Sequence, residues 1–298
     1  MQLDLSYAQS VPLLVAERSR IEFLLVGAGG TGGWLISAIA RLMLEIESKT
    51  NKTATCTIID YDTVEQNNIP RQNFQQSSVG LSKAEVLAAR YSLALGCKIS
   101  AVAAAFSLRM LDSAWNKLTV IVGCVDNAAA RTEISKCLDQ NYIERPPHIF
   151  WLDCGNHPGS SSGQVLLGTT NQFTLETAFD QKENPNFCIN LPSPALQHPE
   201  LVQALPEELA TTRLSCAEIQ ARNQQSLFVN SQVAAIASVY LLELTLTRGL
   251  RRFATYFDSS SGTMRSLYNC GETFKRFTSK CKVIQTGMAL RKALSYTE

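Results

Sequence analysis

The sequence has 298 residues, of which 45% are hydrophobic and 18% charged, enough for one large α/β domain or two small ones with a substantial core. Its formal net charge is +1, and no basic run is interleaved with aromatic residues, so neither nucleic acid nor an acidic membrane is expected as a partner. No apolar stretch reaches the roughly 18 residues of a membrane span, and the first residues lack the order of a signal peptide, so a cytoplasmic location is expected.

Nine cysteines are scattered along the chain, and no two of them form a Cys-x-x-Cys pair. A four-cysteine zinc site is therefore not expected. Cys56, Cys124 and Cys154 lie inside apolar runs, which favours buried small side chains. Reduced thiols are the simplest interpretation of this odd, irregular set.

In the first half of the chain, apolar runs alternate with segments of helical spacing. Residues 1–20 carry apolar side chains and two arginines, and we expect a short helix there that packs on the sheet or on a partner. Ser82 stands three positions before Glu85 and predicts a serine cap for a helix. The alternation predicts a parallel, doubly wound sheet. Its predicted strands are residues 21–26, 54–60, 99–104, 118–123 and 149–154, and its predicted helices are residues 32–47, 82–95 and 128–141.

The pattern changes after Cys154. A strand at 163–169 follows the fifth strand so closely that an antiparallel hairpin is favoured. Residues 173–213 are long, proline-punctuated and weakly periodic, and a loop of that length in a compact domain is usually functional. The fold class that follows is a Rossmann-like doubly wound sheet, with a parallel N-terminal half continuing into a mixed or antiparallel C-terminal half. Its remaining predicted elements are an apolar helix at 226–246, a second hairpin from 252–258 and 264–269, and an unassigned basic tail at 271–298.

A glycine-rich run, Gly27-Ala28-Gly29-Gly30-Thr31-Gly32, stands between the first strand and the first helix. Glycines there let the backbone turn tightly and approach phosphates, while the helix N-terminus offers free N–H groups to an anion. A lone glycine fingerprint is weak, so the residues that follow it decide which nucleotide chemistry is proposed.

Asp60 ends the second strand, where an acidic residue of a dinucleotide fold accepts hydrogen bonds from ribose hydroxyls. The alternative is an ordinary strand-end turn. Asn68 and Arg71 follow on the loop, and Lys83 stands at the next helix start. Fixed cations stabilise charge that develops on phosphoryl oxygens, which a hydride-transfer site does not need. The alternative is that each is a solvated surface charge.

Asp126 follows the fourth strand at the carboxyl edge of the sheet, where ligands of open α/β sheets bind. A lone carboxylate with water and phosphate oxygens suits Mg²⁺, and the alternative is a helix N-cap. The two roles can be divided, with Asp126 on the metal and Asn127 as the cap. No Gly-x-x-x-x-Gly-Lys-Ser/Thr run occurs, which argues against a P-loop nucleotidase. The histidines lack metal-ligand spacing and are interpreted as structural or exposed: His148, His157 and His198.

Together these residues resemble the adenylating domain of ThiF/MoeB/HesA proteins, bacterial relatives of ubiquitin-activating enzymes. The resemblance covers roughly residues 21–154. It is carried by Gly27-x-Gly29-Gly30-x-Gly32, Asp60-Tyr61-Asp62-Thr63-Val64, Asn68, Arg71-Gln72, Val79-Gly80, Lys83, and Asp126-Asn127 with Arg131. More loosely, Ser215-Cys216-Ala217-Glu218 and Gln225-Ser226-Leu227-Phe228-Val229-Asn230 resemble the ThiF-like subfamily of plasmid-borne PRTRC gene systems.

The resemblance implies a single adenylation domain over residues 1–298. Its parts would be a nucleotide-binding half at 21–154, a partner-binding half at 155–270 with a crossover loop at 173–216, and the tail 271–298. It also implies an eight-stranded, partly antiparallel sheet, usually in a homodimer, that binds ATP, Mg²⁺ and a small β-grasp (ubiquitin-like) protein ending in Gly-Gly. The carboxylate of that protein attacks the α-phosphate, giving an acyl-adenylate and pyrophosphate.

Site roles carry over by position in the same way. The nucleotide would be held by the glycine turn (Gly27, Gly29, Gly30 and Gly32), with Asp60 on the ribose. Asn68, Arg71 and Lys83 would hold the phosphates, and Asp126 would hold the magnesium ion.

Two departures accompany the resemblance. The zinc-binding cysteine pairs of many relatives are absent, so no zinc is expected. The N-terminal arginine that some relatives insert into the partner subunit's site has only Arg18 and Arg20 as candidates here. Some relatives also form a thioester with a crossover-loop cysteine, for which Cys216 is the first candidate and Cys188 the second; the alternative is an ordinary thiol.

Three functions stay open from the sequence. ATP-dependent adenylation of a protein C-terminus is the leading hypothesis, because it accounts for the cations and for Asp126. A NAD-dependent oxidoreductase rests on the glycine turn and Asp60 alone. A non-catalytic scaffold of the same fold would bind a plasmid-system partner without using Arg71 or Lys83.

Overall fold

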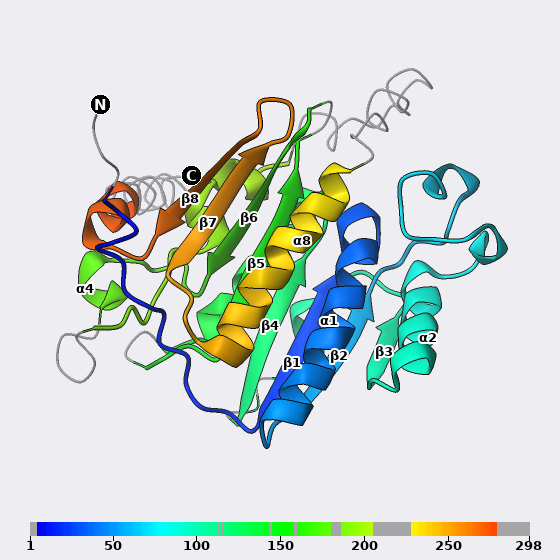
Figure 1. The fold of residues 1–298 in the computed structure, drawn as a ribbon, viewed down its shortest axis with the longest axis horizontal. Helices are drawn as coiled ribbons and strands as arrows, with labels where there is room; N and C mark the ends of the chain where they lie inside the picture. The colour runs from blue at the N-terminus through cyan, green and yellow to red at the C-terminus, as the bar shows by residue number, and fades with distance from the viewer. Residues whose placement is uncertain are drawn as a thin grey trace, which may run out of the picture.

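Eight strands form one continuous sheet in the computed structural model of the chain (Figure 1). Its strand order is β3-β2-β1-β4-β5-β6-β7-β8. The structure describes residues 5–112, 114, 116–142, 145–157, 160–179, 186–204 and 228–278. The strands are β1 (Arg20–Val26), β2 (Thr53–Ile59), β3 (Ile99–Val102), β4 (Lys117–Gly123), β5 (Ile149–Asn156), β6 (Ser162–Gly168), β7 (Arg252–Asp258) and β8 (Thr263–Tyr268).

The N-terminal half of the sheet is parallel, as the sequence predicts. β1 lies between β2 and β4, and β5 continues the parallel order beyond β4. Every residue of β4 is buried, since helices cover both faces of this half. The carboxyl ends of β1, β2 and β4 therefore meet at one edge of the sheet.

The C-terminal half is antiparallel. β5 pairs with β6, β6 with β7 and β7 with β8, so both predicted hairpins are confirmed. The eight-stranded sheet, parallel and then antiparallel, is the Rossmann-like fold class that the sequence predicts.

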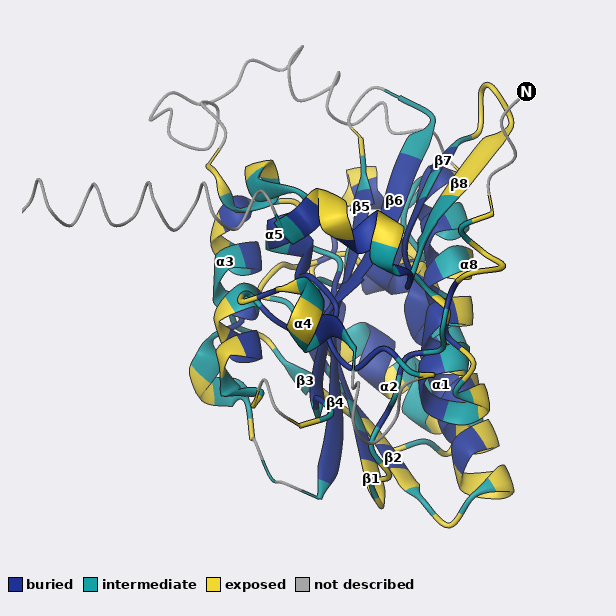
Figure 2. Cartoon of the chain, turned by 90° about the vertical axis from the view of Figure 1, so that its left-hand side faces the viewer, coloured by how far each residue is buried: buried dark blue, intermediate teal, exposed yellow. Residues whose placement is uncertain are grey.

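Helices pack on both faces of the sheet (Figures 1 and 2). α1 (Gly30–Lys49) and α8 (Val229–Leu242) lie side by side on one face, and α3 (Ala128–Cys137) and α5 (Pro194–Gln197) cover the other. Alternate residues of β1 separate into two clusters, because Phe23 packs on the α1 side and Leu24 on the α3 side.

Short elements complete the described part of the fold. α2 (Lys83–Leu95) begins at the predicted serine cap, since the Ser82 side chain accepts a hydrogen bond from the Glu85 N–H group. The remaining elements are η1 (Gln66–Asn68), η2 (Gln76–Ser78), η3 (Leu108–Met110), η4 (Leu138–Gln140), α4 (Leu175–Ala178), η5 (Pro199–Val202) and η6 (Glu243–Thr247).

Some boundaries differ from the prediction. The helix expected at 128–141 ends at Cys137 and tightens into η4. The apolar helix expected at 226–246 consists of α8 followed by the π-helical turn η6. Residues 271–278 of the unassigned tail are helical, while 279–298 lie outside the described residues.

The expected N-terminal helix is wrong for the residues described there. Residues 10–15, the N-terminal strap, run extended along the molecule instead. The Leu13 N–H group donates to the Leu250 carbonyl at 2.8 Å, and the Cys188 N–H group donates to the Pro12 carbonyl at 2.9 Å. Leu13 is 1% exposed, so the strap is anchored by a core side chain as well as by its backbone.

The α8–η6 segment also corrects one expectation from composition. Val229–Thr247 has 19 residues and is long and apolar enough to cross a membrane, contrary to the expectation that no stretch of the chain is. Half of it is buried against the sheet, and Val233, Ala237 and Leu241 belong to the main core. Packing in a folded domain is therefore sufficient to explain its composition.

Candidate nucleotide site

The glycine turn joins β1 to α1 at the carboxyl edge of the sheet. Gly27 has φ of +93°, a left-handed conformation that favours glycine. A Cβ atom on Gly27 would also lie 2.6 Å from the Cys124 carbonyl oxygen, and one on Gly32 would overlap the Gly27 carbonyl group. A Cβ atom on Gly30 would lie 2.7 Å from Cγ of Asn230. Contacts within the protein therefore require three of the four motif glycines.

Gly29 is different. The nearest heavy atom to a Cβ built on Gly29 is Nε2 of Gln72, at an ordinary 3.8 Å. Gly29 is the N-cap of α1, provides no side-chain cap, and is followed by a first turn without acidic residues. This helix N-terminus has the open approach and the uncapped backbone that an anion requires.

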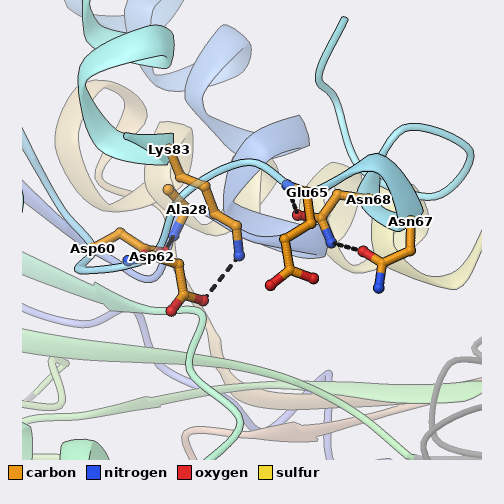
Figure 3. Close-up of polar contacts among 7 residues, drawn as sticks. All are labelled: Ala28, Asp60, Asp62, Glu65, Asn67, Asn68 and Lys83. Carbon is orange, nitrogen blue, oxygen red and sulfur yellow. Dashed lines mark hydrogen bonds and ion pairs between the residues drawn. The ribbon is translucent and has the colours of Figure 1, made fainter. Parts of the chain in front are cut away.

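Asp60 connects the glycine turn to the loop that follows β2. Its Oδ2 accepts a hydrogen bond from the Ala28 N–H group at 2.6 Å, and its Oδ1 accepts one from the Asp62 N–H group at 2.8 Å (Figure 3). Burial raises the pKa of Asp60, and the nearby Lys83 charge opposes that rise. Asp60 therefore shapes the turn at the end of β2. Its carboxylate oxygens can still accept a further hydrogen bond, for example from a hydroxyl group.

Lys83 is not a solvated surface charge, because only 7% of the residue is exposed. Its ammonium group reaches from the start of α2 to Asp62, with 2.9 Å between Nζ and Oδ2 (Figure 3). Half of the Asp62 side chain is exposed, so the pair opens toward solvent on the carboxylate side. Asp62 lies in the family-like motif, but nothing in the sequence spacing indicates that it holds Lys83.

Asn68 and Arg71 are held by the same loop. The Asn68 side chain accepts from the Glu65 N–H group and donates to Oδ1 of Asn67, each at 2.9 Å (Figure 3). Asn68 is 4% exposed and shapes η1. The Arg71 Nε donates to the Asn67 carbonyl at 3.4 Å, and burial lowers the pKa of Arg71 while Glu65 opposes that effect. Arg71 is therefore a partly buried cation rather than a freely solvated one.

Asp126 and Asn127 divide the two roles considered for this position. The Asn127 side chain caps α3 by accepting from the Ala130 N–H group at 2.9 Å, and Asp126 is exposed. Burial and the negative charges of Asp62, Asp126 and Asp60 raise the pKa of Tyr61. Tyr61 thus lies within electrostatic reach of all three carboxylates, so the fold brings Asp126 into the neighbourhood of the loop after β2.

The site offers a magnesium ion one carboxylate, Asp126, so phosphate and water oxygens would have to complete the coordination shell of the ion. Within the described ranges, no three His, Cys, Asp or Glu side chains are grouped as a metal site. A single exposed carboxylate beside a phosphate-binding turn is the arrangement in which Mg²⁺ keeps several waters and takes substrate phosphates as ligands. Asp126 fits that role.

Arg131, the last residue of the family-like motif, forms a buried ion pair instead of facing the site. Its Nε lies 3.1 Å from Oδ1 of Asp153, a residue that is 0% exposed. Burial raises the pKa of Asp153 and the Arg131 charge opposes it. The pair fixes α3 to β5.

The two thioester candidates differ in what the structure says of them. Cys216 lies outside the described residues. Cys188 is 0% exposed, and burial raises the pKa of its thiol, which disfavours the thiolate that a nucleophile needs. Cys188 is therefore wrong as the second candidate. Among the cysteines expected to be buried, Cys56 and Cys154 are buried and Cys124 is partly exposed.

The described histidines have no catalytic arrangement. His198 lies between Glu200 and Tyr256, with 2.8 Å from each ring nitrogen to its oxygen partner. His157 is exposed. Burial and the Arg18 charge lower the pKa of His148.

A cavity of about 510 Å³ opens at the opposite end of the sheet, where β1 and β2 begin. Arg18 lines it, while Arg20 donates to Asn116 at 3.3 Å at the same end. Both candidate N-terminal arginines therefore lie away from the glycine turn of their own chain. In this cavity Glu17 pairs with Lys52 and with Arg248, so one carboxylate offsets only part of the charge of the three cations that line it.

The glycine turn at a helix N-terminus, the acidic residue at the end of β2 and the fixed cations lie at the carboxyl edge of the sheet, where Rossmann-like folds bind their ligands. The chain belongs to the ThiF family, whose family model matches residues 14–244. No curated protein sequence matches the chain.

Solved structures share the fold at low sequence identity. PaaA has a TM-score of 0.53 and 15% identity, over 83% of this chain and 63% of PaaA. MccB of E. coli, solved with ATP, has a TM-score of 0.51 and 15% identity, over 84% of this chain and 64% of MccB. MccB solved with AMPCPP and MccA has a TM-score of 0.51 and 14% identity, with the same coverage. The chain thus spans a little under two thirds of the length of these proteins.

Proposed function

We propose that this protein binds ATP and adenylates the C-terminal carboxylate of a peptide or small protein. The observation that carries the proposal is the buried cation Lys83, fixed beside Asp60 at the edge of the sheet that holds the glycine turn. A hydride-transfer site has no use for such a cation, whereas a reaction at a triphosphate does. Membership of the ThiF family and the fold shared with ATP-bound MccB support the same conclusion.

In this proposal Asp60 accepts a ribose hydroxyl while it keeps its two backbone donors. The N–H groups of the glycine turn and the N-terminus of α1 receive the phosphates, with Gly29 as the point of closest approach. A triphosphate would share or replace Asp62 as the partner of Lys83, because its oxygens carry more negative charge than one half-exposed carboxylate.

The reaction is a displacement at the α-phosphorus. An oxygen of the partner's carboxylate forms a bond to that phosphorus, the bond from phosphorus to the β-phosphate oxygen breaks, and pyrophosphate leaves with the electron pair. Lys83 and Arg71 stabilise the charge that develops on the phosphoryl oxygens. Asn68 keeps the loop that carries Arg71 in shape. Asp126 would hold Mg²⁺, whose charge neutralises the triphosphate when the ion is bound.

The partner proposed from the family resemblance is a small β-grasp, ubiquitin-like protein. The MccB structures that contain MccA support the coarser proposal of a small peptide or protein partner. We also infer a homodimer, a cytoplasmic location, and thioester formation at Cys216 after adenylation. These rest on the resemblance and not on a contact within the described residues.

The first experiment compares nucleotides by isothermal titration calorimetry. ATP with Mg²⁺ should bind more tightly than NAD. Tighter binding of NAD would overturn the proposal in favour of an oxidoreductase. ATP–pyrophosphate exchange with candidate partners ending in Gly-Gly then separates an adenylating enzyme from a scaffold, because a scaffold binds a partner without exchange.

Variants test the residues. Arg71→Ala, Lys83→Ala and Asp126→Ala should each reduce exchange by about 100- to 1,000-fold, the loss typical of one oxyanion-type contact. Lys98→Ala is the matched control, since Lys98 is an exposed lysine just before β3, away from the carboxyl edge. Exchange near the wild-type rate in the three site variants would show that these residues take no part in the reaction.

A further inference from the structure

The first turn of α8 lies against the glycine turn. Asn230 is the second residue of α8 and is 2% exposed. Its side chain occupies the space in which Gly30 would otherwise place a Cβ atom. Gly30 is therefore small because of Asn230, a residue 200 positions later in the chain, and not because a ligand needs the room.

Asn230 also joins three elements through its carboxamide oxygen. Oδ1 accepts from Oγ1 of Thr31, the second residue of α1, at 3.2 Å. The same oxygen accepts from Nδ2 of Asn156, the last residue of β5, at 2.5 Å. A carbonyl oxygen has two lone pairs, so both acceptor positions of Asn230 are used.

We propose that Asn230 is a positioning residue that holds the Gly30–Thr31 part of the glycine turn in the geometry that receives phosphate. Its carboxamide holds that turn against the first turn of α8 and the end of β5. This inference rests on the proposed function, since it assigns Asn230 to the site of ATP binding. Small displacements of a positioning group are costly for reactions of this kind, and a shift of 1 Å can reduce rates by about 100-fold.

Asn230→Ala tests the proposal. The variant should weaken ATP binding by at least about tenfold and raise KM for ATP in pyrophosphate exchange more than it lowers kcat, because Asn230 touches the turn and not the reacting atoms. Asn269→Ala is the matched control. Asn269 is also buried, at 0% exposed, and donates to the Val11 and Leu250 carbonyls beside the edge strand β8, which four strands separate from β1 and its glycine turn. The Asn269→Ala variant should have a lower melting temperature than the wild type and the same dissociation constant for ATP.

A double-mutant cycle makes the test specific. Gly30→Ala alone should abolish ATP binding, because its methyl group collides with Asn230. The same substitution in the Asn230→Ala background should cost much less, because the space is then free. If Gly30→Ala costs the same in both backgrounds, or if Asn230→Ala binds ATP as the wild type does, the proposal is wrong.

ATP binding by the protein and the role of Asn230 can be refuted separately. Wild-type protein that binds no ATP overturns the proposed function, whereas wild-type binding with unchanged binding in Asn230→Ala overturns only the role of Asn230. If Asn230→Ala does not fold, Asn156→Ala removes one of the two donors to Oδ1 and leaves the Gly30 contact in place. It should weaken ATP binding severalfold, and unchanged binding would again contradict the proposal.

Discussion

Gly29→Ala should separate nucleotide binding from stability more cleanly than any other change in the glycine turn. Gly29 has φ of −76° and ψ of −133°, and the nearest atom to the new methyl group lies at 3.8 Å, so the methyl group meets no neighbouring atom. Alanine is a poorer N-cap by up to about 2 kcal/mol. The loss of stability should stay within that figure, or about 3 °C in Tm, because an unfolding entropy of about 2.1 cal/mol/K per residue gives about 0.63 kcal/mol/K for 298 residues.

The effect on ATP should be much larger. A methyl group at Gly29 occupies the open approach to the N-terminus of α1 and keeps phosphate from the backbone N–H groups. A hydrogen bond to a charged group contributes about 1.5–3 kcal/mol, so the loss of one such bond corresponds to about 10- to 150-fold weaker binding. Titration calorimetry with MgATP measures the binding, and differential scanning fluorimetry measures Tm.

Two neighbouring glycines provide the controls. Gly33→Ala places its methyl group 3.5 Å from the Ala28 carbonyl oxygen, an ordinary contact inside α1. It should stabilise the helix by about 0.5–1 kcal/mol and leave ATP binding unchanged. Gly32→Ala should destabilise the protein by about 1–3 kcal/mol or more, because its methyl group overlaps the Gly27 carbonyl. Wild-type affinity in Gly29→Ala, or a loss of affinity in Gly33→Ala, would refute the assignment of Gly29 as the point of phosphate approach.

The remaining predictions concern the partner, the assembly and pH. If Cys216 accepts the activated carboxyl group with release of AMP, a reductant-sensitive adduct with the small partner should form; Cys216→Ala should lose the adduct and retain pyrophosphate exchange, whereas an adduct that persists in the variant means another thiol is used. Light scattering should give twice the 32.7 kDa chain mass at micromolar concentration, and the monomer mass would contradict a homodimer. The lowered pKa of His148 means that the folded state binds a proton less readily than the unfolded chain, so its contribution to stability is present above about pH 6.5 and is lost as the pH falls below it. Urea unfolding at several pH values should show a smaller acid-side loss in His148→Gln, and identical profiles would show that another group dominates.

Most of the sheet could be predicted because its strands are continuous apolar runs. β4 is buried at every position, and β7 and β8 flank a run of serines and a glycine that marks the turn. The caps at Ser82 and Asn127 followed from residue type and position alone. These features are local, so the sequence contains what is needed to predict them.

The contacts that shape the candidate site are not local, and the sequence could not show them. Thr31 and Asn230 are 199 residues apart, and only the pairing of α1 with α8 brings them together. The burial of Lys83 depends on the path of the loop between β2 and α2, which no periodicity describes. The extended path of the N-terminal strap could not be predicted, because its bonding partners Cys188, Leu250 and Asn269 lie more than 170 residues further along the chain.

The N-terminal strap has a consequence for the order in which the chain folds. Its bonds run to Cys188, Leu250 and Asn269, and 258 residues separate Asn269 from Val11. The entropy cost of closing a loop rises with its length, and a ribosome delivers these partners only after β1–β6 have been synthesised. The first described residues to leave the ribosome are therefore among the last to be fixed. Until β7 and β8 have formed, Leu13 has no completed core to enter, and the strap stays available to other contacts.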